Sequence, residues 1–401
     1  MTIPSNTCPE PMSVGERLFP ILFLTGVFFL SFVSRVIFSP LMPTIENEMG
    51  ITHAQAGSLF LMLSIGFFAS MTGSGLVSSR LTHRHTIVLS SVLLGAALIL
   101  FSVEESLAAL RLNMFLLGAA TGFYTPSGIA ILSALVSRRD IGKAMGIHNT
   151  APNLSYIVAP LLCHAFLGWI HWRTLLVFLG LLALAAAASF AMFQKEGQFR
   201  GEPPRPAALA NLGARPLFWV MILLFCLALS GGVGIYAVLP LYLVKERGLD
   251  LDLANTLLGL SRISGLFMVF FAGWLTDKVG EKRTIHAALL LTGATTVLLA
   301  LVPERPLLVM VFLQPAILSC FFPAGFKALS QIVPPNMRSL ATGWVIPFGF
   351  LFGGGVIPAF IGQMAAYRSF STGIWITGAL IACGSLTALL LKPEDFDEEG
   401  C

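Results

Sequence analysis

The sequence predicts an all-α membrane protein with twelve transmembrane helices in two pseudo-symmetric six-helix bundles. Three observations lead to this prediction. The 401 residues are 56% hydrophobic and 11% charged, with a mean hydropathy of +0.84, whereas soluble domains carry about 25% charged residues. Apolar runs long enough to cross a bilayer follow one another along the chain. The second half also repeats the proline and glycine spacing of the first half.

The composition argues against several classes of protein. A soluble enzyme, a nucleic-acid-binding protein or a disordered chain needs far more polar surface than this sequence offers. An outer-membrane barrel is disfavoured because its strands alternate apolar and polar residues. The sequence shows no Ser/His/Asp set, no phosphate-binding loop and no Cys/His spacing typical of metals. We therefore expect no catalytic site, no bound metal and no cofactor.

The individual spans are apolar runs between charged residues, prolines and glycines, and each needs about 20 residues to cross the hydrocarbon core. The first six predicted spans are 18–42, 54–78, 86–102, 107–135, 143–167 and 173–193. The second six are 217–243, 252–276, 284–301, 306–333, 340–365 and 370–391.

The longest connection between spans, 194–216, is the predicted linker between an N-terminal bundle, 1–193, and a C-terminal bundle, 217–401. It contains the proline-rich stretch Glu202-Pro203-Pro204-Arg205-Pro206. Of the 24 Lys and Arg residues, three fall inside spans, fifteen lie on the side of the linker and six lie on the other side. Because basic loops stay in the cytoplasm, the linker and both termini are predicted to be cytoplasmic, with the chain in the plasma (inner) membrane.

The two bundles align with an offset of 197–198 residues. Pro126-Ser127-Gly128 corresponds to Pro323-Ala324-Gly325, and Gly75 corresponds to Gly273. A duplicated six-helix unit of this kind is a recognised transporter architecture.

One loop carries a family resemblance. The segment Gly273-Trp-Leu-Thr-Asp277-Lys278-Val-Gly280-Glu-Lys282-Arg283 resembles the signature loop of the major facilitator superfamily, G-x-x-x-D-K/R-x-G-x-K/R-K/R. In the copy after the second span, Ser79 and Thr82 replace the Asp and the second Gly. The resemblance implies two bundles around a central site that opens to alternate sides.

The resemblance also implies that this loop is a conformational latch formed by Gly273, Asp277, Lys278, Gly280, Lys282 and Arg283. We expect Asp277 just past its span, near the start of the next helix, where the helix dipole and neighbouring cations favour a carboxylate. The alternative is a basic loop that only sets the topology.

Charges inside the spans are all basic in this prediction. The twenty carboxylates fall in loops, in tails or at helix ends, whereas Arg35, Arg262 and Lys327 fall inside spans. An arginine at the bilayer centre costs at least about 2.5–3.5 kcal/mol, so it needs a partner or an aqueous cavity. With no interior carboxylate predicted, an anionic substrate is the simplest partner. Arg35 and Lys327 both have the alternative of snorkelling toward the interface.

Arginine suits anion binding because its planar fork holds carboxylate or oxyanion groups bidentately. We therefore predict that Arg35 and Arg262, from opposite bundles, clamp the substrate. For Arg262 the alternative is a structural group bonded to backbone carbonyls or polar side chains.

Resemblance supports an anion carrier. The run Ser34-Arg35-Val-Ile-Phe-Ser-Pro40-Leu-Met-Pro43 is similar to the first helix of organophosphate:anion antiporters, which carry an arginine at this distance before a proline. Their second arginine lies in the seventh span, where this sequence has Gly232. The presence of an arginine in the eighth span, Arg262, is a feature in which this sequence resembles transporters of oxalate, nitrate and monocarboxylates.

Polar residues supply further candidates for the cavity wall. Asn149, Asn153 and Tyr156 recur at helical spacing and share one face of the fifth span, and Tyr124 is a weaker candidate. The alternative for them is hydrogen bonding between helices. His148 and Lys327 are candidates for ion coupling, since a histidine can carry a proton near neutral pH. For His148 the alternative is a capping or packing role.

The sequence thus predicts a secondary active transporter that moves a small anionic solute, an organic acid or an inorganic oxyanion, by proton symport or anion exchange. We expect it to act as a monomer whose partners are the solute, the lipid bilayer and protons, without nucleic acid. The alternative is a proton-driven drug or metabolite efflux carrier, against which the missing interior carboxylate weighs. A membrane sensor is a third class, although the chain lacks a soluble effector domain.

Overall fold

The computed structural model describes the chain except for residues 1–13, 16, 138, 202, 204–205 and 392–401. The first residues of the predicted N-terminal bundle, the last residues of the predicted C-terminal bundle and part of the predicted linker therefore lie outside the described residues. Every described element is helical, apart from an isolated bridge between Thr82 and Arg200. The prediction of an all-α fold is confirmed.

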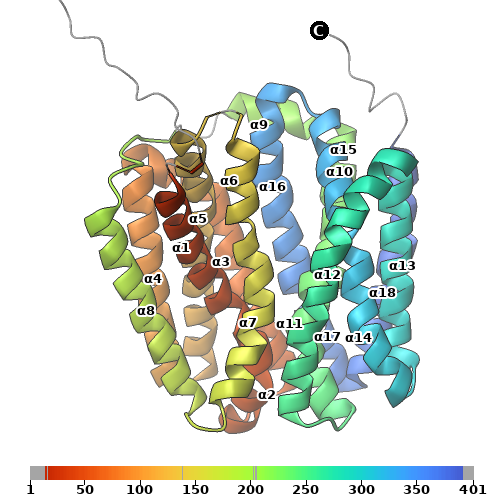
Figure 1. Ribbon diagram of the computed structural model, residues 1–401. Helices are drawn as coiled ribbons and strands as arrows, with labels where there is room; N and C mark the ends of the chain where they lie inside the picture. Colours follow the sequence, from red (N-terminus) through yellow and green to blue (C-terminus); the bar gives the residue numbers. More distant parts are fainter. Residues whose placement is uncertain (1–13, 16, 138, 202, 204–205, 392–401) are drawn as a thin grey trace, which may run out of the picture.

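The described residues of the first half form eight helices. They are α1 (Leu18–Val36), α2 (Phe38–Met49), α3 (His53–Arg80), α4 (His83–Val103), α5 (Leu107–Leu135), α6 (Ile141–His148), α7 (Thr150–Phe166) and α8 (Trp172–Phe193). The short helix α9 (Pro206–Gly213) lies in the connection to the second half. Figure 1 shows α1 to α8 grouped on one side of the molecule.

The second half contains the remaining elements, where η marks a π-helical or 3-10 turn. They are α10 (Pro216–Leu229), η1 (Ser230–Gly234), α11 (Ile235–Leu241), η2 (Tyr242–Glu246), α12 (Leu251–Val279), α13 (Glu281–Leu301), α14 (Glu304–Ser319), α15 (Phe321–Ile332), η3 (Pro335–Met337), α16 (Arg338–Leu351), η4 (Phe352–Val356), α17 (Ile357–Tyr367), α18 (Phe370–Gly384) and η5 (Ser385–Leu390).

The number of spans is consistent with twelve. Ten helical stretches of the described chain are long and apolar enough to cross a membrane, and α12 becomes the eleventh when its two parts, bent by 42°, are taken together. The predicted span 143–167 corresponds to α6 and α7, which are interrupted at Asn149. The helix of the first span is longer than the predicted range, because α1 and α2 form one helical stretch, Leu18–Met49, that contains the apolar window.

Local sequence explains where several helices begin and bend. Thr52 and Gln55 form a reciprocal capping box at the start of α3, and Thr82 caps α4 through the amide of His85. The glycine-rich segments Ser230–Gly234 and Phe352–Val356 are π-helical turns inside longer helices. A Cβ on Gly234 would lie 2.6 Å from the carbonyl oxygen of Gly353, so these turns allow close backbone contact.

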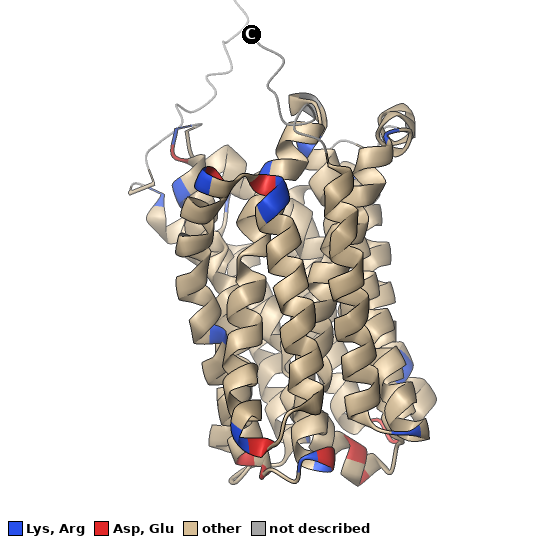
Figure 2. Cartoon of the chain, turned by 90° about the vertical axis from the view of Figure 1, so that its right-hand side faces the viewer, with Lys and Arg blue, Asp and Glu red and all other residues tan. Residues whose placement is uncertain are grey.

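Most charged residues gather at the two ends of the bundle, and few lie in its middle (Figure 2). We call the end that contains Arg17 and the described part of 194–215 the linker end, which is at the top of Figure 1. The opposite end, which contains the loops 50–52, 247–250 and 302–303, is the distal end. This segregation is the one expected of a protein whose middle lies in hydrocarbon.

The two halves contact each other closely toward the distal end, where α3 packs on α17, α2 on α11 and α7 on α12. A Cβ on Gly57 would lie 2.6 Å from the carbonyl oxygen of Pro358, and one on Gly362 would lie 2.4 Å from that of His53. Such distances mean that the helix backbones touch, so the distal end is closed in this conformation.

Candidate functional site

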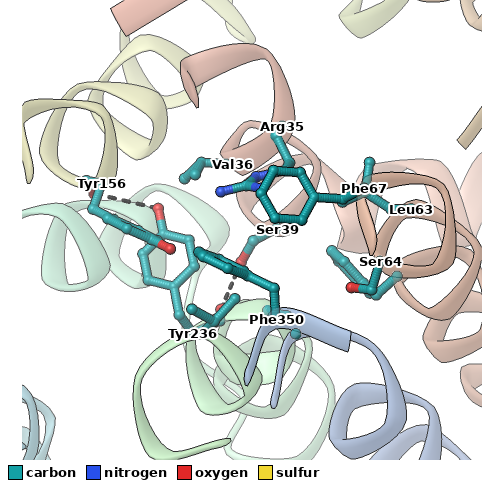
Figure 3. A pocket seen from close by; sticks show the side chains of 13 residues that line it. Arg35, Val36, Ser39, Leu63, Ser64, Phe67, Tyr156, Tyr236 and Phe350 are labelled. Carbon is teal, nitrogen blue, oxygen red and sulfur yellow. Dashed lines mark hydrogen bonds between the residues drawn. The ribbon is translucent and has the colours of Figure 1, made fainter. Parts of the chain in front are cut away.

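A small cavity of about 40 Å³ lies between the two halves near the middle of the bundle. The first half contributes Arg35 from α1, Ser39 from α2 and Tyr156 from α7, as Figure 3 shows. The second half contributes Tyr236 from α11 and Phe350 from α16. A ligand in this cavity would therefore touch both halves at once.

The side chain of Arg35 is buried in the wall of this cavity, with 7% of its surface exposed. Its guanidinium carbon lies 4.3 Å from the ring centre of Phe32, 4.6 Å from that of Phe67 and 4.4 Å from that of Phe350. These contacts are cation–π interactions. Its Nη2 atom has no hydrogen-bond acceptor in the described part of the chain. The structure thus holds a buried cation with unused donor capacity.

Two tyrosines link the halves beside Arg35. The rings of Tyr156 and Tyr236 meet edge to face at 4.8 Å, and the Tyr236 hydroxyl donates to the backbone oxygen of Tyr156 at 3.3 Å. The hydroxyl of Ser39 donates to the backbone oxygen of Tyr236 at 2.6 Å. These bonds fix both aromatic rings at the interface between the halves.

Arg262, from α12, lies against the same tyrosines. Its guanidinium is 4.6 Å from the Tyr236 ring centre and 5.3 Å from the Tyr156 ring centre. Its Nη2 donates to the backbone oxygen of Gly232 at 3.2 Å, while its Nε has no acceptor among the described residues. The sequence-predicted trio of Arg35, Arg262 and Tyr156 is therefore brought together. Arg262 is not in the cavity wall, however, and the carbonyl bond matches its structural alternative.

Asn149 and Asn153 lie on α6–α7, nearer the linker end than Tyr156, and both are exposed. The side-chain amide of Asn153 donates to the backbone oxygen of Asn149 at 3.2 Å. They share a helix face with Tyr156 but are not among the residues that line this cavity.

Tyr124 and His148 are not among the residues that line the central cavity. Both are buried, and the His148 ring stacks on Phe28 at 4.4 Å. The Tyr124 hydroxyl donates to the backbone oxygen of Leu24 at 2.7 Å and lies 3.1 Å from His148 Nε2. These contacts join α5 and α6 to α1.

Lys327 lies in an ion cluster at the linker end and not at the cavity. Its Nζ is 2.8 Å from Asp277 Oδ1 and 2.9 Å from Glu281 Oε1. Asp277 was expected just past its helix, but α12 continues to Val279 and places it in the last turn. The helix dipole disfavours a carboxylate there, and Lys327 supplies the compensating charge. Glu281, in the first turn of α13, has the favourable position.

The other residues of the predicted latch surround this cluster. Lys278 lies over the Trp274 ring at 4.3 Å, and Lys282 donates to the backbone oxygen of Leu389 at 2.8 Å. Gly280 has a φ of +89°, a conformation that L side chains rarely adopt, which explains the glycine between the two helices. Gly273 lies in α12, and Arg283 is exposed on α13.

A buried carboxylate was not among the residues predicted for the site. Glu46, in α2, is 5% exposed, and its Oε2 has no hydrogen-bond partner in the described part of the chain. Its Oε1 lies 2.8 Å from His53 Nδ1 and 3.7 Å from Lys245 Nζ, across the interface between the halves. Glu46 lies in the last turn of α2, so it is a carboxylate at a helix end as predicted, and contacts across the interface between the halves bury it there.

Comparison with known proteins agrees with this architecture. The sequence profile of the Major Facilitator Superfamily matches residues 24–303 and 233–400. The chain is 24% identical over 402 residues to the "Probable sulfoacetate transporter SauU" of Cupriavidus necator, covering 92% of each chain. It is 26% identical over 360 residues to the "Membrane sensor protein UhpC" of Salmonella typhimurium, covering 80% of this chain and 79% of the relative.

A solved structure shows the same fold. The chain superimposes with a TM-score of 0.84 on a bacterial homolog of the human lysosomal transporter Spinster, in an inward-facing and occupied conformation, at 17% identity. The match covers 96% of this chain and 99% of that chain. The profile, the helices and this fold lead to one conclusion. The chain is a multi-pass membrane transporter, not an enzyme, and it belongs to the major facilitator superfamily.

Proposed function

We propose that the chain is a secondary active transporter for a small anionic solute, either an organic acid or an inorganic oxyanion. The observation that carries this proposal is Arg35, a buried cation in the wall of a cavity between the halves, with an N–H group that has no acceptor among the described residues. Burying an unpaired guanidinium in a membrane protein is costly, so a partner is expected. The name of the Cupriavidus relative supports an anion as that partner.

In this proposal the substrate binds Arg35 and Tyr156, with Arg262 adding positive charge from behind the tyrosines. Asn149 and Asn153 line the path from the linker end. The bundles 1–193 and 217–401 rock about the cavity, and the cluster around Asp277 is broken and remade as the linker end opens and closes. The linker end is cytoplasmic, the membrane is the inner membrane, and the unit is a monomer.

Coupling is by proton symport or by anion exchange. Glu46 is the buried carboxylate that a proton-driven carrier would use, so proton-driven efflux stays the second candidate. The two candidates differ in the sign of the substrate: the anion carrier binds a negatively charged solute, whereas many substrates of the exporter would be lipophilic cations.

The test is the thermal stabilisation of purified protein by an anion panel that contains sulfoacetate, nitrate, oxalate and phosphate. A ligand stabilises by RT ln(1 + [L]/Kd), which is about 2.7 kcal/mol at 100 times Kd. We expect Arg35→Gln and Arg262→Gln each to abolish the shift given by the best anion. Arg305→Gln, at an exposed position, is the matched control and should keep it.

A shift with lipophilic cations and none with any anion would replace this function by efflux. Binding of an anion without its uptake into proteoliposomes would favour a sensor, as the name of the Salmonella relative suggests.

A further inference from the structure

The wall of the central cavity is mostly apolar. Arg35, Ser64 and the Tyr156 hydroxyl are the polar groups directed at it, because the hydroxyls of Ser39 and Tyr236 are used in the backbone bonds described above. Carbon covers most of the remaining wall, from Val36, Phe60, Leu63, Phe67, Val233 and Phe350. Figure 3 shows the guanidinium on one side of the cavity, with Phe67 and Phe350 beside it.

The Arg35 guanidinium exposes mainly the edge of its plane to the cavity. Three phenyl rings lie within 4.3 to 4.6 Å of the guanidinium carbon and occupy its surroundings. The unpartnered Nη2 is a donor on the rim of the guanidinium. A bound anion is therefore held from one direction, by charge-assisted hydrogen bonds to this rim.

This asymmetry separates two kinds of anion. An inorganic oxyanion has acceptor oxygens on every side, and the oxygens that face Val233 or Phe350 would lose water without gaining a donor. Each polar group buried in that way costs about 1–3 kcal/mol. An organic anion turns its charged group toward Arg35 and places its carbon part on the apolar wall, where burial is favourable.

The volume limits the size of the ligand. A cavity of about 40 Å³ offers space for roughly three water molecules. A Cβ on Gly354 would reach 3.1 Å from Val233 Cγ1 and would narrow the cavity further. In this conformation the site accommodates only a short ligand.

We propose that the cavity selects a short organic anion, a carboxylate or sulfonate with one to three carbons, over an inorganic oxyanion of the same size. The acidic group binds the rim of Arg35, and the carbon part rests on Val233 and Phe350. This inference rests on the proposed function, since it specifies the anion that this same site takes.

The experiment compares matched pairs of ligands on the full-length protein by thermal stabilisation at constant ionic strength. The pairs are acetate with nitrate and methanesulfonate with perchlorate, each an organic anion with an inorganic oxyanion of the same charge. Within each pair the molecules are similar in size, and the first has a methyl group where the second has a polar group or atom. We expect the first member to bind at least about tenfold more tightly, the factor for one unsatisfied polar group.

A variant tests whether the wall is the cause. Val233→Thr keeps the shape of the side chain and adds a hydroxyl, so the preference within each pair should fall several-fold. Val309→Thr, on an exposed part of α14 away from the cavity, is the matched control and should keep the full preference.

Equal affinities within the pairs, or tighter binding of nitrate and perchlorate, would overturn this inference while leaving the proposed function intact. An unchanged preference in Val233→Thr would also overturn it, because the selection would then not come from this wall. If no anion of either kind stabilises the protein, the proposed function fails as well. The comparison on the unmodified protein needs no variant to fold.

Discussion

At the scale of single residues, the main feature of this chain is the placement of two arginines between its halves. Arg35 is held by aromatic rings from both halves, so part of its lost hydration is replaced by cation–π attraction. Arg262 reaches the same tyrosines from α12 and bonds to one backbone oxygen. Neither residue has a carboxylate beside it in the described ion pairs, which leaves both able to attract an anion.

Tyr124 gives a residue-scale prediction. Its hydroxyl bonds to the backbone of α1 and lies next to His148, away from the cavity. We expect Tyr124→Phe to lower the free energy of unfolding by about 1 kcal/mol, the usual contribution of one hydrogen bond. The stabilisation by the best anion should not change. Thermal unfolding with and without ligand measures both quantities.

Tyr156→Phe is the matched variant, because it also removes a tyrosine hydroxyl, here from a residue of the cavity wall. It should weaken the stabilisation by anion with a smaller effect on the unliganded protein. If Tyr124→Phe weakens anion binding as much as Tyr156→Phe does, Tyr124 is part of the site after all.

At the scale of elements, the connection between the halves docks on the loop that carries the altered copy of the signature motif. The amides of His83 and Arg84 donate to the backbone oxygens of Phe199 and Gly197, at 3.1 and 2.9 Å. The amide of Gly201 donates to Ser78 at 2.9 Å. Backbone bonds thus hold this loop, whereas the second half uses the ion cluster of Lys327 at the related position.

The close contact between Gly201 and Ser78 predicts that adding one methyl group at position 201 loosens this connection. A Cβ on Gly201 would lie 2.2 Å from Ser78 Oγ, so Gly201→Ala should displace the segment. We expect tryptic cleavage at the exposed residues Lys195 and Arg200 to become several-fold faster. Gly213→Ala is the control, since nothing lies within 4 Å of that Cβ. Equal cleavage rates in both variants would show that the docking contributes little.

At the scale of the whole molecule, the halves are held together at the distal end. Lys245 of the second half is 3.7 Å from Glu46 of the first half and also donates to the side chain of Asn47. His53 of the first half packs on Phe370 of the second, with ring centres 4.7 Å apart. In the proposed alternating-access cycle these contacts must break before the distal end can open.

Lys245→Gln should therefore shift the equilibrium toward a conformation open at the distal end. Removing one partly buried ion pair is worth about 1 kcal/mol, or roughly a fivefold change in the ratio of the two conformations. Spin labels at Glu105 and Arg305, exposed on the distal side of the two halves, report the separation in electron-electron double resonance.

Lys143→Gln is the control for this shift, because Lys143 pairs with Asp140 within the first half. A distance distribution that stays the same in Lys245→Gln would mean that backbone packing alone, at Gly57 and Gly362, keeps this end closed.

Much of this protein could be predicted from its sequence because the bilayer imposes simple rules. A span must be apolar and about 20 residues long, so hydropathy alone located the helices now seen as α3, α4, α5 and α8. The cost of a buried charge likewise singled out Arg35 and Arg262 before their surroundings were known. Family membership followed from one loop whose glycine needs a positive φ.

Only the tertiary structure decided which of these residues meet. The predicted first span ended at residue 42, because the run after Pro43 carries two carboxylates, Glu46 and Glu48, and looks like a loop. Only packing against Lys245 and His53 shows that Glu46 is buried. Helical spacing put Asn153 and Tyr156 on one face but could not tell which part of it lines a cavity. Lys327 finds its carboxylates about 50 residues earlier in the chain. The sequence by itself determined the class of protein, because solvation depends on each residue's own chemistry; the site depends on contacts between distant segments, which only the folded chain creates.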